Sequence, residues 1–410
     1  MNLGRGFLLV ATAQGLRLGA GLVVFVVLAR LLGPAPFGEF AYWLAIATLL
    51  TVPVSFGSST LVLRSFGSHP GRARETLGEV LTTKLVLGVA VLLVGLIVLT
   101  FMDSQHARGL LFMLLMAQLF ESFAEFYGLG FRVQGHFAQE SATATIVAAV
   151  QLAMMSAAAF FLRDLSAVAL TFMLSRLIGL IITRYRSQVL TGAIGLDALG
   201  KVPQTLKRAW AYALELGLLT AYGQIDTLII HHALGSHAVG LYQAGMKLVQ
   251  GTSRLAPILA QVLLPTLAQK AGSPIEFARI SARVIGVFGA SGVMCWLVLG
   301  VFADGLTAGL FGAQYASLVP LLPWFGLLLC TRFLETGAGL VLVARGMQGR
   351  KVWLVAAQLL LLLAAGYVSL QSYGLKGWLL ANIGTIACLL LAYAWLMRRP
   401  RPESANSSRF

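Results

Sequence analysis

The chain has 410 residues, of which 58% are hydrophobic and only 11% are charged, and its mean hydropathy is +0.84. Soluble domains are about half apolar and about a quarter charged, so this composition excludes an ordinary soluble protein. The formal net charge is +15. In a soluble protein that surplus would suggest nucleic-acid binding, but here the basic residues lie between hydrophobic segments, where they act as topology signals. We therefore expect no nucleic-acid partner.

Apolar windows long enough to cross a bilayer follow one another along the whole chain. A spanning helix needs about 20 predominantly apolar residues. Twelve windows meet this requirement, and they cover residues 7–32, 38–62, 80–101, 109–131, 141–162, 166–183, 209–234, 238–266, 281–303, 318–343, 352–372 and 377–397. The predicted fold class is an all-α integral membrane protein with about twelve transmembrane helices.

The basic residues gather in alternate connections between these windows. Twenty of the 30 lysines and arginines fall in the connections on the side of the N-terminus, whereas four fall on the opposite side. Cytoplasmic loops carry the excess of Lys and Arg. This asymmetry predicts that both termini are cytoplasmic and that the protein lies in a bacterial inner membrane.

The longest polar connection divides the predicted helices into two sets of six. We expect an N-terminal lobe over residues 1–183, a cytoplasmic connection over 184–208, a C-terminal lobe over 209–397 and a basic cytoplasmic tail over 398–410. With six helices in each lobe, both lobes enter the membrane from the same side. This arrangement predicts a parallel pseudo-repeat about an axis along the membrane normal.

A short pattern recurs in the two predicted lobes at an offset of 202 residues. Each copy falls in the tight turn after the first helix of its lobe. The first copy is Leu32, Gly33, Gly38 and Phe40, and the second is Leu234, Gly235, Gly240 and Tyr242. The shared position in both halves supports an internal duplication of the kind found in transporters.

Several ionisable residues fall inside the predicted helices, where insertion of each costs about 2.5–3.5 kcal/mol. Residues kept at this cost face the interior of the bundle or a water-filled cavity. They are Arg17, Lys84, Glu121, Glu125, Arg176, Glu215, Asp226, Lys247, Arg254, Arg332 and Glu335.

The seventh and eighth windows form an antiparallel hairpin that brings acids and bases to similar depths. Asp226 is level with Lys247, and Arg254 lies about one helical turn from the level of Glu215. The spacings of eleven and seven residues keep each like-charged pair on one helical face. An acidic stripe opposing a basic stripe is therefore expected, either as a structural pairing or as an ion-coupling site.

Four basic residues are candidates for binding an anionic substrate in a cationic cavity. Arg17 is the strongest, since it has no acid within one helical turn and an unpaired guanidinium in a membrane needs water or a phosphate. Arg254 is the second, and Lys247 and Arg332 complete the set. The i,i+3 spacing of Arg332 and Glu335 favours an ion pair between them.

Three acids are candidates for ion coupling or for structural pairing, namely Asp226, Glu215 and Glu121. Lys84 lies near the cytoplasmic end of the third window, so we expect its side chain to snorkel to the interface. No nucleophile elbow, phosphate-binding loop or metal-ligand cluster occurs in the sequence. The sequence thus predicts no enzyme, no metal and no cofactor, and leaves open coupling to H⁺ or Na⁺.

Three runs of sequence carry a family resemblance. They are LARLLGPAPFGEFAYWLA over residues 28–45, QIDTLIIHHALGSHAVGLYQAGMKL over 224–248 and LFGAQYASLVPLL over 310–322. In order and spacing, these runs resemble the polysaccharide transporter branch of the multidrug, oligosaccharidyl-lipid and polysaccharide (MOP) exporter superfamily. This branch contains the Wzx-type O-antigen flippases.

The resemblance implies a two-lobed MATE-like bundle whose central cationic cavity opens alternately to each side. Such proteins turn over undecaprenyl-diphosphate-linked oligosaccharide repeat units in the lipid bilayer, before a polysaccharide polymerase and a chain-length regulator act. Arg17 and Arg254 stand where these flippases place cavity arginines, and Asp226 falls at the family's seventh-helix Asp position. The sugar composition and the kind of surface polysaccharide stay open.

Two other classes of protein share this composition. A drug or cation antiporter of the same superfamily predicts an acidic cavity, whereas the intramembrane charge without an obvious partner in this sequence is mainly basic. A membrane-bound polymerase or ligase typically carries a large periplasmic loop. The longest outer connection, residues 302–317, is short and contains one acid, Asp304, so the enzyme class is disfavoured.

Overall fold

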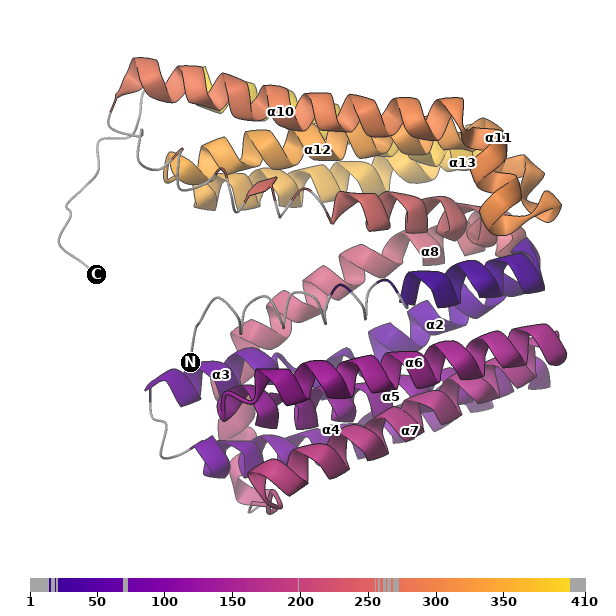
Figure 1. The fold of residues 1–410 in the computed structure, drawn as a ribbon, viewed down its shortest axis with the longest axis vertical. Coiled ribbons are helices and arrows are strands. Elements are labelled where there is room, and N and C mark those ends of the chain that lie inside the picture. Colours follow the sequence, from indigo (N-terminus) through magenta and orange to yellow (C-terminus); the bar gives the residue numbers. More distant parts are fainter. Residues whose placement is uncertain are drawn as a thin grey trace. The chain divides into compact units, whose positions relative to one another are not determined.

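A computed structural model describes residues 21–68, 73–197, 199–254 and 273–398, with single positions 15, 19, 256, 259, 260, 263 and 267 between them. Within these residues the chain is all-helical, as predicted (Figure 1). Nine helices of the described part are long and apolar enough to cross a membrane. The all-α, multi-pass class is confirmed, whereas the total of about twelve helices and the orientation of the termini stay predictions.

The chain divides into two compact units, Met1–Gly240 and Leu241–Phe410. The first continuous helical stretch that the structure describes in the first unit is Gly21–Leu32. Its further elements are α2 (Pro34–Ser55), α3 (Ser58–Ser68), α4 (Ala73–Thr100), α5 (Gln105–Val133), α6 (Phe137–Phe161), α7 (Leu165–Thr191), η2 (Leu199–Lys201) and most of α8 (Val202–Ser253). The predicted lobes and the connection over 184–208 stay predictions.

The second unit contains the end of α8 and the helices that follow. These are α10 (Pro274–Val301), α11 (Ala303–Leu306), η4 (Thr307–Phe311), η5 (Ala313–Leu321), α12 (Leu322–Ala344) and α13 (Gln348–Arg398). Helix α12 packs against both α10 and α13. In the first unit, α5 packs against α7, α2, α4 and α6.

Two helices exceed 50 residues, and each is interrupted once. The backbone leaves the helical region at Gly235 of α8 (φ 78°, ψ −177°) and at Gly374 of α13 (φ 59°, ψ −147°). Such positive φ angles favour glycine because they are strained for residues that carry a Cβ. Both breaks fall in connections between predicted windows, so α8 and α13 each comprise two helical segments.

The two copies of the repeated glycine pattern share a backbone conformation and contact each other. Gly33 (φ 80°, ψ 172°) matches Gly235, which lies 202 residues later. A Cβ on Gly38 would lie 1.8 Å from the Ser236 carbonyl oxygen, and a Cβ on Gly240 would lie 1.9 Å from the Pro34 carbonyl oxygen. The contact is reciprocal, since Pro34 and Ser236 are also separated by 202 residues.

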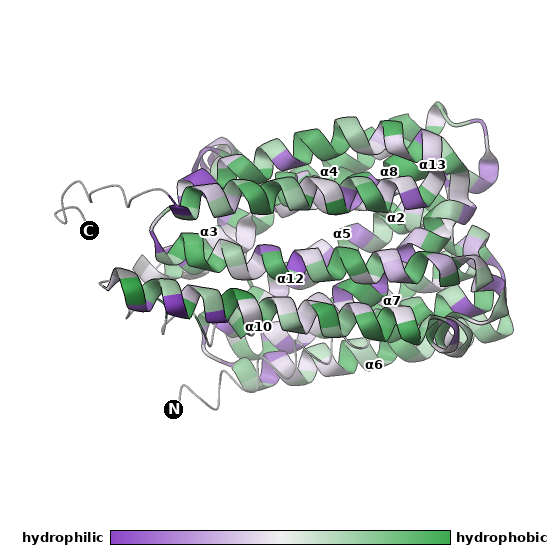
Figure 2. Ribbon diagram, turned by 90° about the horizontal axis from the view of Figure 1, so that it is seen from above, coloured by the Kyte–Doolittle hydropathy of each residue, from purple (hydrophilic) through white to green (hydrophobic). Residues whose placement is uncertain are grey.

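Apolar residues cover the described helices along most of their length, and hydrophilic residues gather mainly at helix ends and connections (Figure 2). On α4 the exposed side chains include Val89, Leu93 and Ile97, each more than half exposed. Their spacing of four residues places them on one helical face. Such an apolar stripe fits the hydrocarbon of a bilayer, where polar groups would be costly.

An ion-pair network joins the segment before α8, which includes Asp197 and Lys201, to the start of α4. Lys201 Nζ lies 3.0 Å from Glu75 Oε1, 3.3 Å from Glu79 Oε1 and 3.0 Å from Asp197 Oδ2. Arg208 forms a second ion pair with Glu79. The three carboxylates lie within 4.8 Å of one another, as ligands of a metal ion would, but the Lys201 ammonium already bridges them. These ion pairs join residues 197–208 to the start of α4 within the first unit.

The backbone contact at the repeated glycines gives a first prediction. Replacing Gly38 with Ala places a methyl group inside the contact distance of a backbone carbonyl, which must then move. We expect Gly38→Ala and Gly240→Ala each to destabilise the protein by about 1–3 kcal/mol, the usual cost of overpacking. Thermal unfolding in detergent measures the effect. The control is Gly223→Ala, since a Cβ there meets no atom within 4 Å. Wild-type stability of both test variants would contradict the close contact.

The Lys201 network gives a second prediction. Lys201→Ala leaves three neighbouring carboxylates without their ammonium, so repulsion should lower the melting temperature. Oxygen ligands at this spacing bind Ca²⁺, so calcium should raise the melting temperature of the variant more than that of the wild type. The matched control, Lys207→Ala, removes an exposed lysine of the same segment. An equal calcium response of wild type and Lys201→Ala would refute the bridging role.

Candidate functional site

A polar cavity of about 420 Å³ lies inside the first unit. Helix α5 contributes Glu121, Glu125, Gly128 and Arg132 to its wall. Their spacings of four, three and four residues keep all of them on one face of an α-helix. Three charged residues and one glycine thus lie on the cavity side of α5.

Helix α6 supplies a second stripe with the same spacing. It consists of Glu140, Ala144, Val147 and Gln151. Most of the remaining wall comes from three other parts of the unit. These are Arg176 and Thr183 of α7, Gly21 and Val24 before α2, and Ser59 of α3. Small side chains leave the open space, and the polar side chains face it from several different helices.

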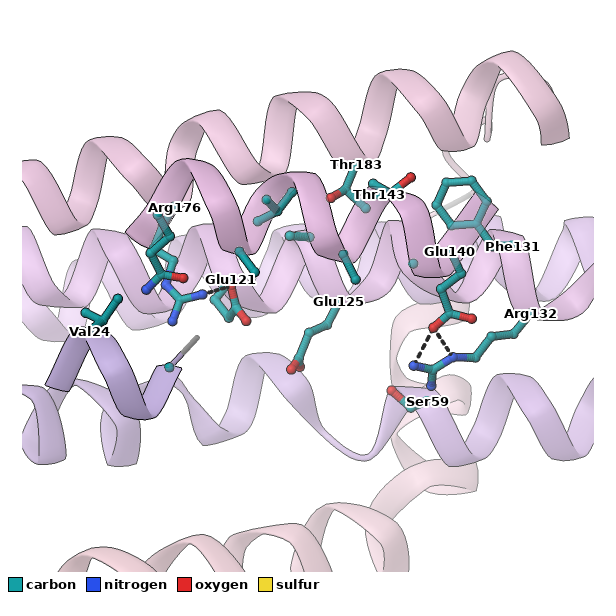
Figure 3. A pocket seen from close by; sticks show the side chains of 17 residues that line it. Val24, Ser59, Glu121, Glu125, Phe131, Arg132, Glu140, Thr143, Arg176 and Thr183 are labelled. Carbon is teal, nitrogen blue, oxygen red and sulfur yellow. Dashed lines mark hydrogen bonds and ion pairs between the residues drawn. The ribbon is translucent and has the colours of Figure 1, made fainter. Parts of the chain in front are cut away.

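Two ion pairs join the helices around the cavity (Figure 3). Arg176 Nη1 of α7 lies 2.6 Å from Glu121 Oε2 of α5, and both side chains are 19% exposed. Arg132 Nε of α5 donates a hydrogen bond of 2.8 Å to Glu140 Oε1 of α6, and Arg132 Nη2 forms an ion pair with the same oxygen at 2.8 Å. The Arg176 guanidinium also lies over the Phe172 ring, 5.0 Å from its centroid. The pairs fix α5 against both neighbouring helices.

Glu125 lies between these two ion pairs (Figure 3). Its side chain is exposed and lines the cavity, as Ser59 does. Both residues also line a second cavity of about 280 Å³ in the same unit, where Ser55, Ser58 and Tyr212 are among the polar neighbours. The two cavities therefore share a wall, and a carboxylate stands at that wall.

The prediction that Lys84 snorkels to the interface is wrong. The side chain is only 2% exposed, and its Nζ donates to the Val54 carbonyl at 3.0 Å and to Ser122 Oγ at 2.8 Å. Helix α2 ends beside Phe56, whose φ is 30°, so its last carbonyls lack intrahelical donors. The Lys84 ammonium caps one of them, which is the favourable charge for a helix C-terminus.

The acids proposed for coupling lie in the first unit. Glu121 is paired with Arg176 rather than standing alone on α5. Glu215 of α8 lines the second cavity. Asp226 lies further along α8, before the break at Gly235, whereas Lys247 follows it in the second unit. The pairing of Asp226 with Lys247 stays a prediction.

The predicted anion-binding residues are distributed along the chain. Arg17 lies outside the described residues. Lys247 Nζ donates to Gln250 Oε1 at 3.4 Å, and Arg254 is exposed just beyond the end of α8. On α12, Arg332 and Glu335 form no ion pair within the described part of the chain, and Arg332 Nε is buried without a hydrogen-bond partner. Arg332 and Glu335 still attract each other electrostatically, and their structural pairing stays a prediction.

Several polar residues of the cavity wall were not predicted from the sequence, among them Arg132, Glu140 and Gln151. Arg132 stands at the end of a predicted window, where it was interpreted as a topology signal, and Glu140 stands just before the next window. Gln151 is a single amide in an apolar window. The signal that could have found them is the repeated spacing of four, three and four residues in two consecutive helices, which puts polar residues on facing stripes.

Solved structures with the same fold include a lipid flippase and a multidrug transporter of the MOP superfamily. The lipid II flippase MurJ, in an inward closed conformation, superposes with a TM-score of 0.75 and 13% identity over 96% of this chain and 88% of that chain. An inward-facing multidrug resistance MATE transporter gives 0.69 and 15%, over 92% and 93% respectively. At these identities the likeness defines the fold alone, and that fold is MATE-like.

A family model described as "Polysaccharide biosynthesis protein" matches residues 3–270. The chain belongs to this family, and the predicted resemblance is confirmed. The amylovoran biosynthesis protein AmsL of Erwinia amylovora is 24% identical over 109 residues, which span 26% of this chain and 28% of AmsL. The match thus covers about a quarter of each protein.

The ion pair between α5 and α7 gives a third prediction. Arg176→Gln leaves Glu121 charged and without its guanidinium. Removing one partner of a fully buried pair costs about 3–5 kcal/mol, and this partly buried pair should cost less. We expect a clear loss of thermal stability in detergent, and partial recovery in the swapped variant Arg176→Glu with Glu121→Arg. Arg279→Gln, at an exposed position of α10, is the control and should melt like the wild type. An unchanged melting temperature for Arg176→Gln would show that the pair contributes nothing.

Proposed function

We propose that this protein is a flippase for undecaprenyl-diphosphate-linked oligosaccharide repeat units. It would move them from the cytoplasmic to the periplasmic leaflet of a bacterial inner membrane by alternating access. The observation that carries the proposal is membership of the polysaccharide biosynthesis family over residues 3–270. The fold, which is shared with a lipid II flippase, supports it.

The cargo is an anion at its diphosphate, which suits the basic residues expected inside the membrane. In this proposal Arg17, Arg254, Lys247 and Arg332 hold the diphosphate at different stages of transport. Arginine is well suited because its planar guanidinium binds phosphate oxygens in a bidentate manner. The exposed position of Arg254 and the unpartnered Nε of Arg332 support such a role.

The three candidate acids have two different roles in this proposal, structural pairing and coupling to an ion gradient. The ion pair of Glu121 with Arg176 supports a structural role for Glu121. Glu215 and Asp226 are proposed for coupling to a gradient of H⁺ or Na⁺, and the cavity position of Glu215 supports this. Transport of this kind breaks no covalent bond, so the proposal includes no catalytic residue. A polymerase and a chain-length regulator are the proposed partners on the periplasmic side.

A second candidate function is an ion-coupled antiporter of drugs or organic cations. The observation in its favour is the charge of the first unit's cavity, whose described wall carries three carboxylates and two guanidiniums. Two of these carboxylates are already neutralised by ion pairs. The remaining acidic charge is small, and the family favours a glycan cargo.

Purified protein in liposomes gives the fourth prediction. We expect the wild type to move undecaprenyl-diphosphate-linked oligosaccharide between leaflets, measured as the loss of label accessible to an external glycosidase. Arg17→Ala and Arg254→Ala should each slow this movement by about tenfold or more, since each removes charge-assisted hydrogen bonds to phosphate. Arg279→Ala is the control, because it removes an exposed arginine of α10.

Two results would contradict this proposal in different ways. Wild-type rates in both arginine variants would exclude them as ligands of the diphosphate. Absence of flipping, together with gradient-driven release of an organic cation from the same liposomes, would instead support the antiporter. Imposed H⁺ and Na⁺ gradients in parallel samples identify the coupling ion in either case.

A further inference from the structure

We propose that the cavity inside the first unit binds the sugar part of the cargo and not its diphosphate. The proposal rests on the flippase function above and assigns one end of the substrate to a defined set of residues. The cavity volume of about 420 Å³ falls in the range of small-molecule sites, about 300–1,000 Å³. The space is therefore sufficient for a ligand rather than for a few water molecules only.

The charge of the wall argues against the diphosphate as the occupant. Among the described lining residues, the only guanidiniums are those of Arg132 and Arg176, and each is held by a carboxylate. Glu125 adds a third carboxylate between them. A diphosphate would face repulsion from these acids, since like charges brought close together are unfavourable. A neutral, polyhydroxylated group meets no such penalty.

The polar groups of the wall match what a sugar ring offers. Sugar hydroxyls both donate and accept hydrogen bonds, and the wall presents the carboxylate of Glu125, the amide of Gln151 and the hydroxyl of Ser59. The Thr143 and Thr183 hydroxyls donate to backbone carbonyls of their own helices and can accept from a sugar. A hydrogen bond to a charged group is the strongest of these, about 1.5–3 kcal/mol in the usual range. Glu125, which lies between the two ion pairs (Figure 3), is therefore the principal anchor in this proposal.

Two unsatisfied atoms in the same wall favour a polar occupant. Arg176 Nε and Glu140 Oε2 are buried without a hydrogen-bond partner in the described structure. Buried polar atoms are normally satisfied, and each exception requires an explanation. A group rich in hydroxyls next to both residues would supply the missing donors and acceptors after small side-chain rotations.

Two glycines mark the open space of the cavity. A Cβ on Gly21 or on Gly128 would meet no atom within 4 Å. A larger side chain at position 128 would therefore extend into the cavity without striking the backbone. This makes Gly128→Leu a plug for the cavity that leaves both flanking ion pairs in place.

The test compares the binding of two lipids by the purified full-length protein. One probe is lipid-linked oligosaccharide extracted from membranes of the source organism, and the other is undecaprenyl diphosphate without sugar. We expect the wild type to bind the first more tightly. In Gly128→Leu and in Glu125→Gln, this sugar-dependent gain should fall by about tenfold or more, whereas affinity for the bare lipid should not change.

Matched controls separate occupancy of the cavity from general damage. Gly286→Leu makes the same change at an exposed glycine of α10 where a Cβ also meets no atom within 4 Å. Asp304→Asn removes an exposed acid from α11. Both should keep the wild-type preference for the sugar-bearing lipid, and melting curves establish that all four variants are folded.

Several outcomes would overturn the proposal. A wild type that flips the oligosaccharide lipid, with variants that keep its sugar-dependent gain, refutes the sugar site alone and leaves the flippase function standing. Variants that keep the gain but lose their response to Na⁺ or pH would assign the cavity to a coupling ion instead. A wild type that neither binds nor flips either lipid refutes the proposed function itself.

Discussion

A charge inside a membrane-spanning helix must be paired or reach water, and in the first unit this requirement falls mainly on α5. Glu121 is satisfied by Arg176 of α7, and Arg132 is satisfied by Glu140 of α6. These contacts hold three helices together at two levels. They also leave the face of α5 between them lined by Glu125 and small residues, and so they define the cavity. The same pairs that stabilise the bundle thus shape its polar interior.

This arrangement suggests that different residues bind the sugar end and the diphosphate end of the substrate. The cavity of the first unit has little net charge and many hydrogen-bonding groups, which suits sugars. The basic residues proposed for the diphosphate, such as Lys247 and Arg254, lie beyond the break of α8 at Gly235. Family membership is consistent with a glycan cargo. Separate recognition of sugar and diphosphate would let the protein discriminate its cargo from other lipid diphosphates.

Much of the fold was predictable because a bilayer demands long apolar helices, and breaks such as Gly235 and Gly374 fell between the predicted windows. The predictions that were wrong concern side chains whose surroundings are set by tertiary contacts. Lys84 is buried because α2 ends inside a predicted window and exposes a carbonyl. Arg132 was counted as a loop charge because its partner comes from the next helix. Hydropathy predicts neither the end of α2 nor the partner of Arg132. The spacing of polar residues in neighbouring helices does indicate which of them share a face.

The most direct test of this account is the movement of undecaprenyl-diphosphate-linked oligosaccharide across liposomes that contain the unmodified protein, compared with protein-free liposomes and with undecaprenyl diphosphate lacking sugar. The account predicts protein-dependent movement that is faster for the sugar-bearing lipid. Equal rates with and without the protein would contradict it.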